Sequence, residues 1–184
     1  MSIFDLSNRN AIVTGSSRGI DRAIAQALAG LGANVVISSR KQDACEAVAS
    51  AINAKSKGRA IAIAASIGDK ASLEHLMQAS RQKLGEIDIL VCNAASNPYY
   101  GPLAGISDEQ FEKVLRNNVL SSHWLAALVA PGMAERGAGS IILISSIGGM
   151  RGSPRSSEPI IFPKQRIFSW RAAWRSNGAL AECG

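Results

Sequence analysis

The residues with the clearest chemical meaning form a glycine-containing stretch, Thr14-Gly15-Ser16-Ser17-Arg18-Gly19-Ile20-Asp21. It lies between an apolar run, residues 11–13, and a helical pattern that begins near Arg18. A strand, a glycine turn and a helix in this order can hold a dinucleotide diphosphate. Glycine lets the backbone approach the phosphates, and the first N–H groups of the helix face the anion. Because glycines also mark ordinary turns, the rest of the chain has to support this interpretation.

Polar residues also follow the other apolar segments of the chain. The segments are 34–38, 60–64, 87–92 and 140–145, and the residues that follow them or close them are Ser39 with Arg40, Ser66, Asn93 and Ser146. In a parallel sheet, ligands bind at the carboxyl ends of the strands, near the point where the strand order reverses. These residues are therefore candidates for one shared site.

Strand-like and helix-like segments alternate along residues 10–145. With 10–14, the apolar segments above are five predicted strands; the predicted helices cover 18–31, 41–55, a segment capped by Asp69 or Ser72 and ending at Gly85, a segment starting at Ser107, and about 118–136. The strands are short and almost continuously apolar, as expected of strands buried on both faces. Right-handed crossovers then predict an α/β fold with a doubly wound, Rossmann-like parallel sheet and helices on both faces.

Composition narrows the class of protein. The chain has 184 residues and 47% hydrophobic residues, enough for one domain with a core. No apolar run reaches the ~18 residues of a membrane span, and the first residues do not resemble a secretory signal. Cys45, Cys92 and Cys183 are odd in number and widely spaced, so we expect free thiols and a cytoplasmic protein.

The positive charge does not indicate nucleic acid binding. The formal net charge is +6, and residues 155–184 hold five basic and two acidic residues, half of that excess. The remaining excess forms no basic stripe. His75 and His123 fall on predicted helices and are expected to be surface or packing residues, so we predict no metal site.

Four motifs together resemble the short-chain dehydrogenase/reductase family. They are Thr14-Gly15-x-x-x-Gly19-Ile20, Cys92-Asn93-Ala94-Ala95, Asn118-Val119 and Ser145-Ser146-Ile147-Gly148-Gly149. Their order and spacing match the family from Asn8 to about Pro154. The stretch from Asn93 to Pro102 is similar to a carbonyl-reductase subgroup. The resemblance implies carbonyl reduction or alcohol oxidation of a small molecule by hydride transfer with a nicotinamide cofactor, in a homo-oligomer.

The resemblance also implies roles for individual residues. The phosphate turn would comprise Gly15, Ser17, Arg18, Gly19 and Ile20; Asn93 and Ala94 would lie beside the adenosine ribose; Asn118 would hold a proton-relay water; and Ser146 would hydrogen-bond the substrate oxygen. Each polar residue also has a local interpretation. Asn93 could be a turn residue, Asn118 a helix cap and Ser146 a hydroxyl that satisfies nearby backbone.

Cofactor choice is predicted from the charge after residues 34–38. Family members that prefer NAD carry an acidic residue there, whereas this chain has Ser39 and Arg40. A hydroxyl and a guanidinium suit the 2′-phosphate of NADP, and Arg18 adds a second cation. We therefore expect NADP(H) to be preferred and NAD(H) to be possible. The alternative for Arg40 is a solvated charge at a helix start.

The chain departs from the family pattern at three places. Asp21 replaces the usual third glycine and would weaken phosphate binding if it faced the phosphates, but would be tolerated if it faced solvent. Ser66 replaces an Asp that contacts adenine in many members. The Tyr-x-x-x-Lys pair, which supplies the general acid or base, is missing, since the only tyrosines are Tyr99 and Tyr100.

The last residues suggest a reason for this loss. Residues 155–184 lack a clear strand or helix period, and Pro159 and Pro163 would interrupt a helix. For Glu158 to Lys164, codons exist whose shifted frame encodes Ala-Tyr-Asn-Ile-Ser-Lys. We therefore predict a frameshift or truncation near Pro154, with a Rossmann domain over 1–154 and an aberrant, poorly ordered tail over 155–184.

Three consequences follow from this interpretation. Strand 141–144 would become an open apolar edge of the sheet. The family's helical dimer interface would be incomplete, and catalysis would be impaired. The alternative function is a non-catalytic nucleotide-binding or interaction remnant.

Overall fold

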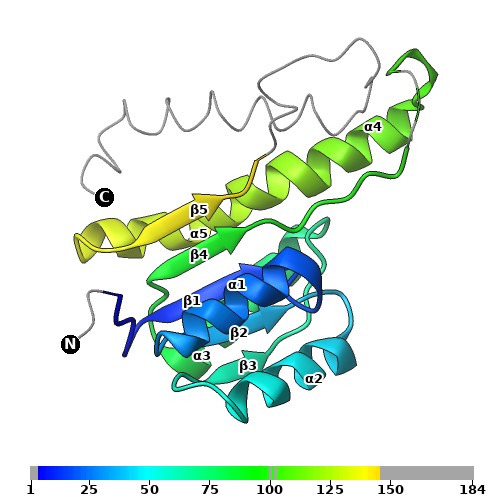
Figure 1. Ribbon diagram of the computed structural model, residues 1–184. Coiled ribbons are helices and arrows are strands. Elements are labelled where there is room, and N and C mark those ends of the chain that lie inside the picture. Colours follow the sequence, from blue (N-terminus) through cyan, green and yellow to red (C-terminus); the bar gives the residue numbers. More distant parts are fainter. Residues whose placement is uncertain (1–3, 100, 102, 146–184) are drawn as a thin grey trace.

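The part of the chain that the structure describes is built around one parallel sheet, which has five strands there. The computed structural model describes residues 4–99, 101 and 103–145. The strands are β1 (Asn10–Thr14), β2 (Asn34–Ser38), β3 (Ala60–Ala62), β4 (Ile89–Cys92) and β5 (Ser140–Leu143). Their spatial order is β3-β2-β1-β4-β5, and every neighbouring pair is parallel (Figure 1). The predicted doubly wound sheet is confirmed.

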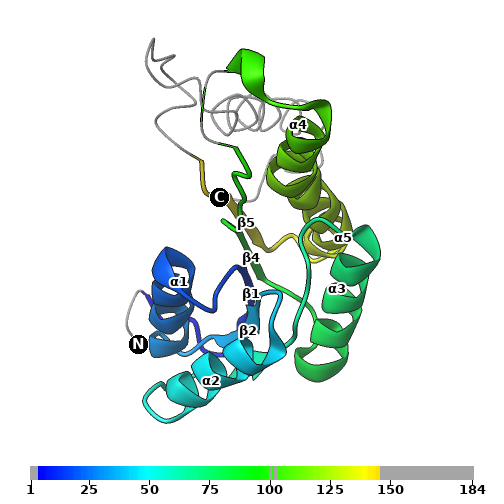
Figure 2. The ribbon, with the colours of Figure 1, turned by 90° about the vertical axis from the view of Figure 1, so that its right-hand side faces the viewer.

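Helices cover both faces of this sheet. They are α1 (Gly19–Gly30), α2 (Gln42–Asn53), α3 (Lys70–Leu84), α4 (Asp108–Leu115) and α5 (Ser121–Glu135), with a short 3-10 helix at Leu103–Gly105 and a π-helix at Arg116–Leu120. Helices α1 and α2 lie on one face, whereas α3 and α5 lie on the other (Figure 2). The two-sided covering explains the nearly continuous apolar strands.

The strand period of two divides the core into two layers. Ile12, Val36 and Leu90 pack in a buried cluster that includes residues of α3 and α5. Their neighbours Ala11, Val13, Val35, Ile37 and Val91 pack in a second cluster with residues of α1 and α2. Ala25 and Ala29 of α1 are fully buried, and their small side chains let this helix lie close to the sheet.

Several predicted boundaries move by a few residues. β3 ends at Ala62, two residues earlier than predicted. Ile63 N still donates to Ile37 O of β2 at 3.1 Å, but Ala64 N donates to the Gln42 side chain, Oε1, at 2.8 Å. Asp69 caps α3 by accepting from Ala71 N at 3.0 Å. Ser72, the other predicted cap, accepts from Ser66 N at 3.0 Å instead. The choice between the two caps is thereby resolved.

The two predicted helical segments after residue 107 form one continuous run. Ser107 begins it with a capping box in which Gln110 is the partner. The π-helix Arg116–Leu120 then joins α4 to α5, and Ser121 N donates to Arg116 O across the wider turn. A π turn inserts one extra residue into a helix and often marks a functional position.

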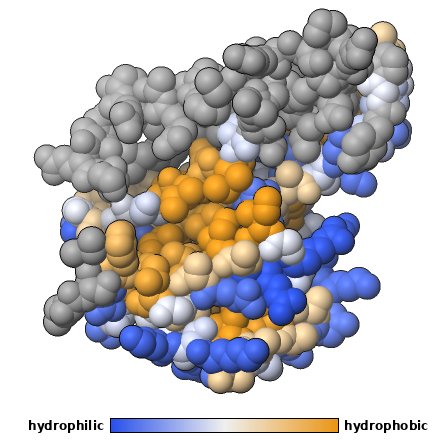
Figure 3. Space-filling model, viewed as in Figure 1, coloured by the Kyte–Doolittle hydropathy of each residue, from blue (hydrophilic) through white to orange (hydrophobic). Residues whose placement is uncertain are grey.

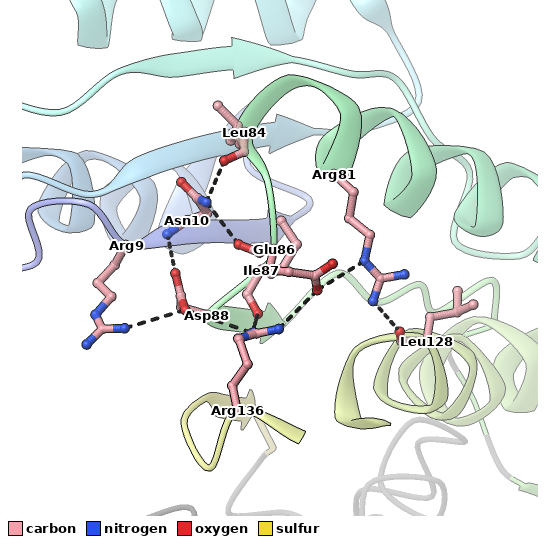
Figure 4. Close-up of polar contacts among 9 residues, drawn as sticks. All are labelled: Arg9, Asn10, Arg81, Leu84, Glu86, Ile87, Asp88, Leu128 and Arg136. Atoms are coloured by element: carbon pink, nitrogen blue, oxygen red, sulfur yellow. Dashed lines mark hydrogen bonds and ion pairs between the residues drawn. The ribbon is translucent and has the colours of Figure 1, made fainter. Parts of the chain in front are cut away.

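A polar network ties together the amino ends of β1 and β4 (Figure 4). Asn10 Nδ2 donates to Leu84 O at 2.7 Å and to Glu86 O at 2.9 Å. Arg136, which follows α5, donates to Glu86 Oε2 and to Ile87 O, both at 3.1 Å. These contacts fix the loop that leads into β4 and therefore the position at which β4 ends.

β5 lies at one edge of the sheet. Within the described part of the chain its only strand partner is β4. Ile142 is 40% exposed and is paired in register with Val91, whose side chain belongs to the α1 and α2 layer. Figure 3 shows apolar side chains gathered on the α1 face of the molecule, above that helix.

Candidate functional site

The candidate site lies where the strand order reverses. β1 leads through α1 to β2 on one side, whereas β4 pairs with β1 on the other side. The loops after β1 and β4 therefore leave the sheet next to each other. Thr14 Oγ1 joins them, since it accepts from Asn93 N and from Ala94 N, each at 3.3 Å. Sequence reasoning had not singled out the hydroxyl of Thr14.

Ser16 anchors the turn after β1 to the ends of β1 and β2. This fully buried residue donates from Oγ to Val13 O at 2.7 Å and accepts from Ser38 N at 2.9 Å. Its own backbone N donates to Ser38 O at 3.1 Å. The turn is thus tied to the end of β2. A small hydroxyl residue between two glycines is the signal for such an anchor in the sequence, but its burial is visible only in the structure.

Glycine is required at Gly15 for two reasons. Its φ of +77° lies in the left-handed region, where other residues are strained. A Cβ there would also lie 3.2 Å from Ala94 Cβ. The turn and the loop after β4 are therefore nearly in contact at Gly15.

The start of α1 presents backbone donors toward the switch point. Arg18 is the N-cap residue, and its side chain makes no capping hydrogen bond. The first N–H groups of a helix lack partners within the helix and carry its positive dipole end, so they can bind an anion. Ser17 is half-buried, while Arg18, Gly19 and Ile20 are exposed, with Ile20 at 69%.

Asp21 faces this same turn. Its Oδ1 accepts a hydrogen bond from Asn93 Nδ2. Its Oδ2 lies only 2.5 Å from the position that a Cβ on Gly15 would occupy. Of the two orientations considered from the sequence, the structure has the one directed toward the turn, with the residue half-buried.

The predicted 2′-phosphate residues follow β2. Ser39 Oγ lies 3.1 Å from Cys45 Sγ, and Ala65 N donates to Ser39 O at 2.9 Å. Arg40 is exposed. Ser66 is exposed as well, at the end of the segment after β3. Ser39, Arg40 and Ser66 come after β2 and β3, so they lie at the same end of the parallel sheet as the glycine turn that follows β1.

Asn118 is buried within the π-helix and is 4% exposed. Its Oδ1 accepts from Ser96 N and its Nδ2 donates to Ser96 O, both at 2.9 Å. The neighbouring Asn117 donates from Nδ2 to Ser96 Oγ at 2.6 Å. The amide of Asn118 therefore holds the backbone of the loop after β4, a partner that sequence reasoning did not find.

Cys92 is the last residue of β4 and directly precedes Asn93 of the candidate site. Burial raises the pKa of its thiol from the ordinary 9.0 to about 12, and a hydrogen bond with Ser122 offsets part of this rise. The thiol therefore stays protonated at neutral pH and is not a nucleophile.

Ser146, the predicted substrate-binding serine, lies outside the described residues, as do the proposed boundary at Pro154 and residues 155–184. Among residues 4–99, 101 and 103–145, no group of three or more His, Cys, Asp or Glu side chains is arranged to hold a metal ion. In the same part of the chain, no helix combines the length and apolar character of a membrane span.

A parallel sheet with order β3-β2-β1-β4-β5 and a glycine turn at its switch point defines a Rossmann-like α/β fold. The profile of a family described as short chain dehydrogenase matches residues 9–158. The chain belongs to this family, as its motifs indicated.

Relatives and solved structures agree with this assignment. Dehydrogenase/reductase SDR family member 4 of Oryctolagus cuniculus is 39% identical over 142 residues, which are 77% of this chain and 54% of the relative. The mitochondrial dehydrogenase/reductase SDR family member 2 of Homo sapiens is 40% identical over 145 residues, 77% of this chain and 50% of the relative. The chain thus spans about half the length of the curated relatives it matches.

Two crystal structures have the same fold. A short-chain type dehydrogenase/reductase from Mycobacterium marinum superimposes with a TM-score of 0.89 at 27% identity, covering 98% of this chain and 73% of that one. A 3-oxoacyl (acyl-carrier-protein) reductase from Agrobacterium tumefaciens C58, solved with NADP bound, gives 0.86 at 29% identity, covering 95% and 66%.

Proposed function

We propose that the chain is the cofactor-binding part of an NADP(H)-preferring oxidoreductase that acts on a small-molecule carbonyl or alcohol. The observation that carries this proposal is the glycine turn at the switch point, with Gly15 and the uncapped start of α1 beside Asn93. Family membership and the NADP held by one structural relative support it.

The backbone of the site fits a dinucleotide. Gly15 and Gly19 have φ values of +77° and +61° and no side chains of their own, so neither glycine blocks an approaching diphosphate. The N–H groups of the first turn of α1 would hold that diphosphate, and Asn93 with Ala94 would lie beside the adenosine ribose. Ser39 and Arg40 would bind the 2′-phosphate of NADP, with NAD as the weaker alternative.

The bound cofactor would supply or accept the hydride, and the chain's own residues would position the reacting groups. Asn118 fixes the loop after β4 through Ser96, which defines one wall of the site. Ser146 would donate a hydrogen bond to the substrate oxygen as its charge changes. Because the sequence has no Tyr-x-x-x-Lys pair after Ser146, the proton donor for an alkoxide is missing. Loss of general acid–base catalysis costs ~10²–10⁴-fold in rate.

Titration of the purified chain with NADPH and with NADH, followed by nicotinamide fluorescence and calorimetry, tests the proposal. We expect saturable binding that is tighter for NADPH, and negligible turnover of simple aldehydes, ketones and alcohols. Absence of binding at millimolar cofactor, both to the folded wild-type chain and to folded chains with Asp21→Asn or Asp21→Gly, would overturn it. Robust turnover would overturn the proposed impairment alone.

A second candidate function is a non-catalytic nucleotide-binding or interaction protein, which the missing Tyr and Lys favour. Binding without turnover is its expected signature too, so the gene must separate the two. If the DNA across codons 150–165 encodes Tyr-x-x-x-Lys in a shifted frame, the chain descends from an active enzyme by frameshift. An early stop or a different peptide in that frame contradicts the frameshift.

A further inference from the structure

Asp21 lies at the position where the cofactor diphosphate would approach the chain. It is the third residue of α1 (Gly19–Gly30), in the first turn, where the backbone N–H groups lack partners within the helix. Its side chain turns back over Gly15 and reaches the loop after β4. A carboxylate in this place is an anion already held by the anion-binding end of the helix.

The two carboxylate oxygens make separate contacts. Oδ1 accepts a hydrogen bond from Asn93 Nδ2, which joins α1 to the residue after β4. Oδ2 lies 2.5 Å from where a Cβ on Gly15 would be. The absence of that Cβ is the feature that lets a diphosphate approach the backbone, so Asp21 fills the space that the glycine leaves open.

We propose that Asp21 sets the cofactor affinity of this chain by competing with the diphosphate for the glycine turn. This inference rests on the proposed function. Cofactor binding then requires the Asp21 side chain to leave Gly15 and the contact with Asn93 to break. The Asp21 carboxylate also repels a dianionic diphosphate that approaches Gly15. Asp21 is half-buried, so solvent screens this repulsion less than it would in water.

Asp21 has a different role from Ser39 and Arg40, the residues proposed to select between the two cofactors. NAD and NADP share the diphosphate and differ at the 2′-phosphate, so Asp21 must lower the affinity for both by the same factor. The carboxylate also stabilises the unliganded chain, because it complements the helix dipole and accepts from Asn93. Removing its charge should therefore have opposite effects on cofactor affinity and on unliganded stability.

The test compares Asp21→Asn and Asp21→Gly with wild type. Asp21→Asn keeps an oxygen acceptor for Asn93 and removes the charge, whereas Asp21→Gly removes the side chain as well. Asp43→Asn is the matched control, because Asp43 is also an acidic residue in the first turn of a helix, α2, and is exposed. Dissociation constants for NADPH and NADH are measured at low salt by calorimetry. The melting temperature and the Asn93 side-chain amide resonances are recorded without cofactor.

We expect Asp21→Asn to tighten both cofactors by about tenfold, which is ~1.4 kcal/mol, and Asp21→Gly by at least as much. The unliganded melting temperature should fall in both variants, and the Asn93 amide resonances should shift. Asp43→Asn should leave the dissociation constants within about twofold of wild type.

The outcomes distinguish this inference from the proposed function. If wild type binds and the Asp21 variants bind no more tightly, the competition is contradicted and the proposed function stands. If only the Asp21 variants bind, both are supported. If folded wild type and folded variants all fail to bind at millimolar cofactor, both are overturned. A gain for only one of the two cofactors also contradicts the inference.

Discussion

Asn118 holds both backbone groups of Ser96, accepting from its N–H and donating to its C=O at 2.9 Å each. The two hydrogen bonds use the amide oxygen and one amide proton of a buried side chain. Asn118 therefore links the π-helix to the loop after β4 by two hydrogen bonds. Whatever water the site holds, this side chain first serves to place that loop.

Removing the two hydrogen bonds between Asn118 and Ser96 should lower the stability of the fold. Asn118→Ala leaves the N–H and C=O of Ser96 without their partners, and we expect the free energy of unfolding to fall by about 1–3 kcal/mol. Asn118→Asp is the matched variant, because it keeps the acceptor for Ser96 N but sets a carboxylate oxygen against Ser96 O in a buried site, so its loss should be at least as large. Urea unfolding followed by circular dichroism measures both. An Asn118→Ala chain as stable as wild type would show that the loop does not depend on this residue.

Arg40 should determine the preference for NADPH. Because Arg40 is exposed and follows β2, Arg40→Ala should leave the fold intact and weaken NADPH binding by about tenfold, with little change for NADH. Arg59→Ala is a suitable control, since Arg59 is also an exposed arginine but precedes β3, at the opposite end of the sheet. Competition titrations with the two cofactors give the ratio. Unchanged affinity for both cofactors would assign Arg40 to the solvated helix start instead, and equal weakening of both would mean that Arg40 does not act through the 2′-phosphate.

The pair Arg136–Glu86 should contribute modestly to stability. Its Nη1 and Oε2 atoms are 3.1 Å apart, but the side chains are 32% and 51% exposed, so solvent screens the attraction. We expect a coupling energy of about 0.2–1 kcal/mol in a double-mutant cycle of Arg136→Met and Glu86→Gln. The coupling should shrink in high salt.

The two single variants in this cycle should not be equal. Arg136→Met also removes the donor to Ile87 O, so it should cost more than Glu86→Gln. Unfolding midpoints in urea at low and high salt give both comparisons. A larger effect of Glu86→Gln would mean that the hydrogen bond to Ile87 contributes little.

Alkaline pH should destabilise the fold through Cys92. In the unfolded chain the thiol ionises near 9.0, whereas burial keeps it protonated to about 12 in the folded chain. The folded state thus binds more protons between these values. Stability from this residue is complete below pH 9 and declines as pH rises, by at most ~1.4 kcal/mol per pH unit. Urea unfolding from pH 7 to 11 should show a steeper decline for wild type than for Cys92→Ala. Parallel declines would contradict the assignment to this thiol.

Local sequence predicted the central strands well and the ends of others less well. β1 and β2 begin and end where expected, because each is an apolar run bounded by polar residues on both sides. β4 begins at Ile89, two residues later than predicted, although Ile87 is buried. Ile87 lies in the loop that Asn10 and Arg136 hold, and no local pattern separates such a residue from a strand.

Contacts between distant residues limited the prediction of the site. Asp21 and Asn93 are 72 positions apart, so the sequence alone could not decide whether the carboxylate faced the turn or solvent. The same holds for Ser96 and Asn118, which are 22 positions apart. The family motifs located Asn93 and Asn118, whereas their partners depend on how the loops after β1 and β4 lie in the fold.

The π turn at Arg116–Leu120 also bears on how this chain can change by insertion and deletion. An α-helix rotates about 100° per residue. A deletion of one residue elsewhere in α4 or α5 would therefore turn one part of the helix by that angle relative to the other. A π turn absorbs an extra residue locally, so a deletion within Arg116–Leu120 would restore regular α geometry and let α4 and its capping box keep their direction relative to α5. This segment is thus the place in the helix that tolerates a one-residue change of length, with loss of the contact between Asn118 and Ser96.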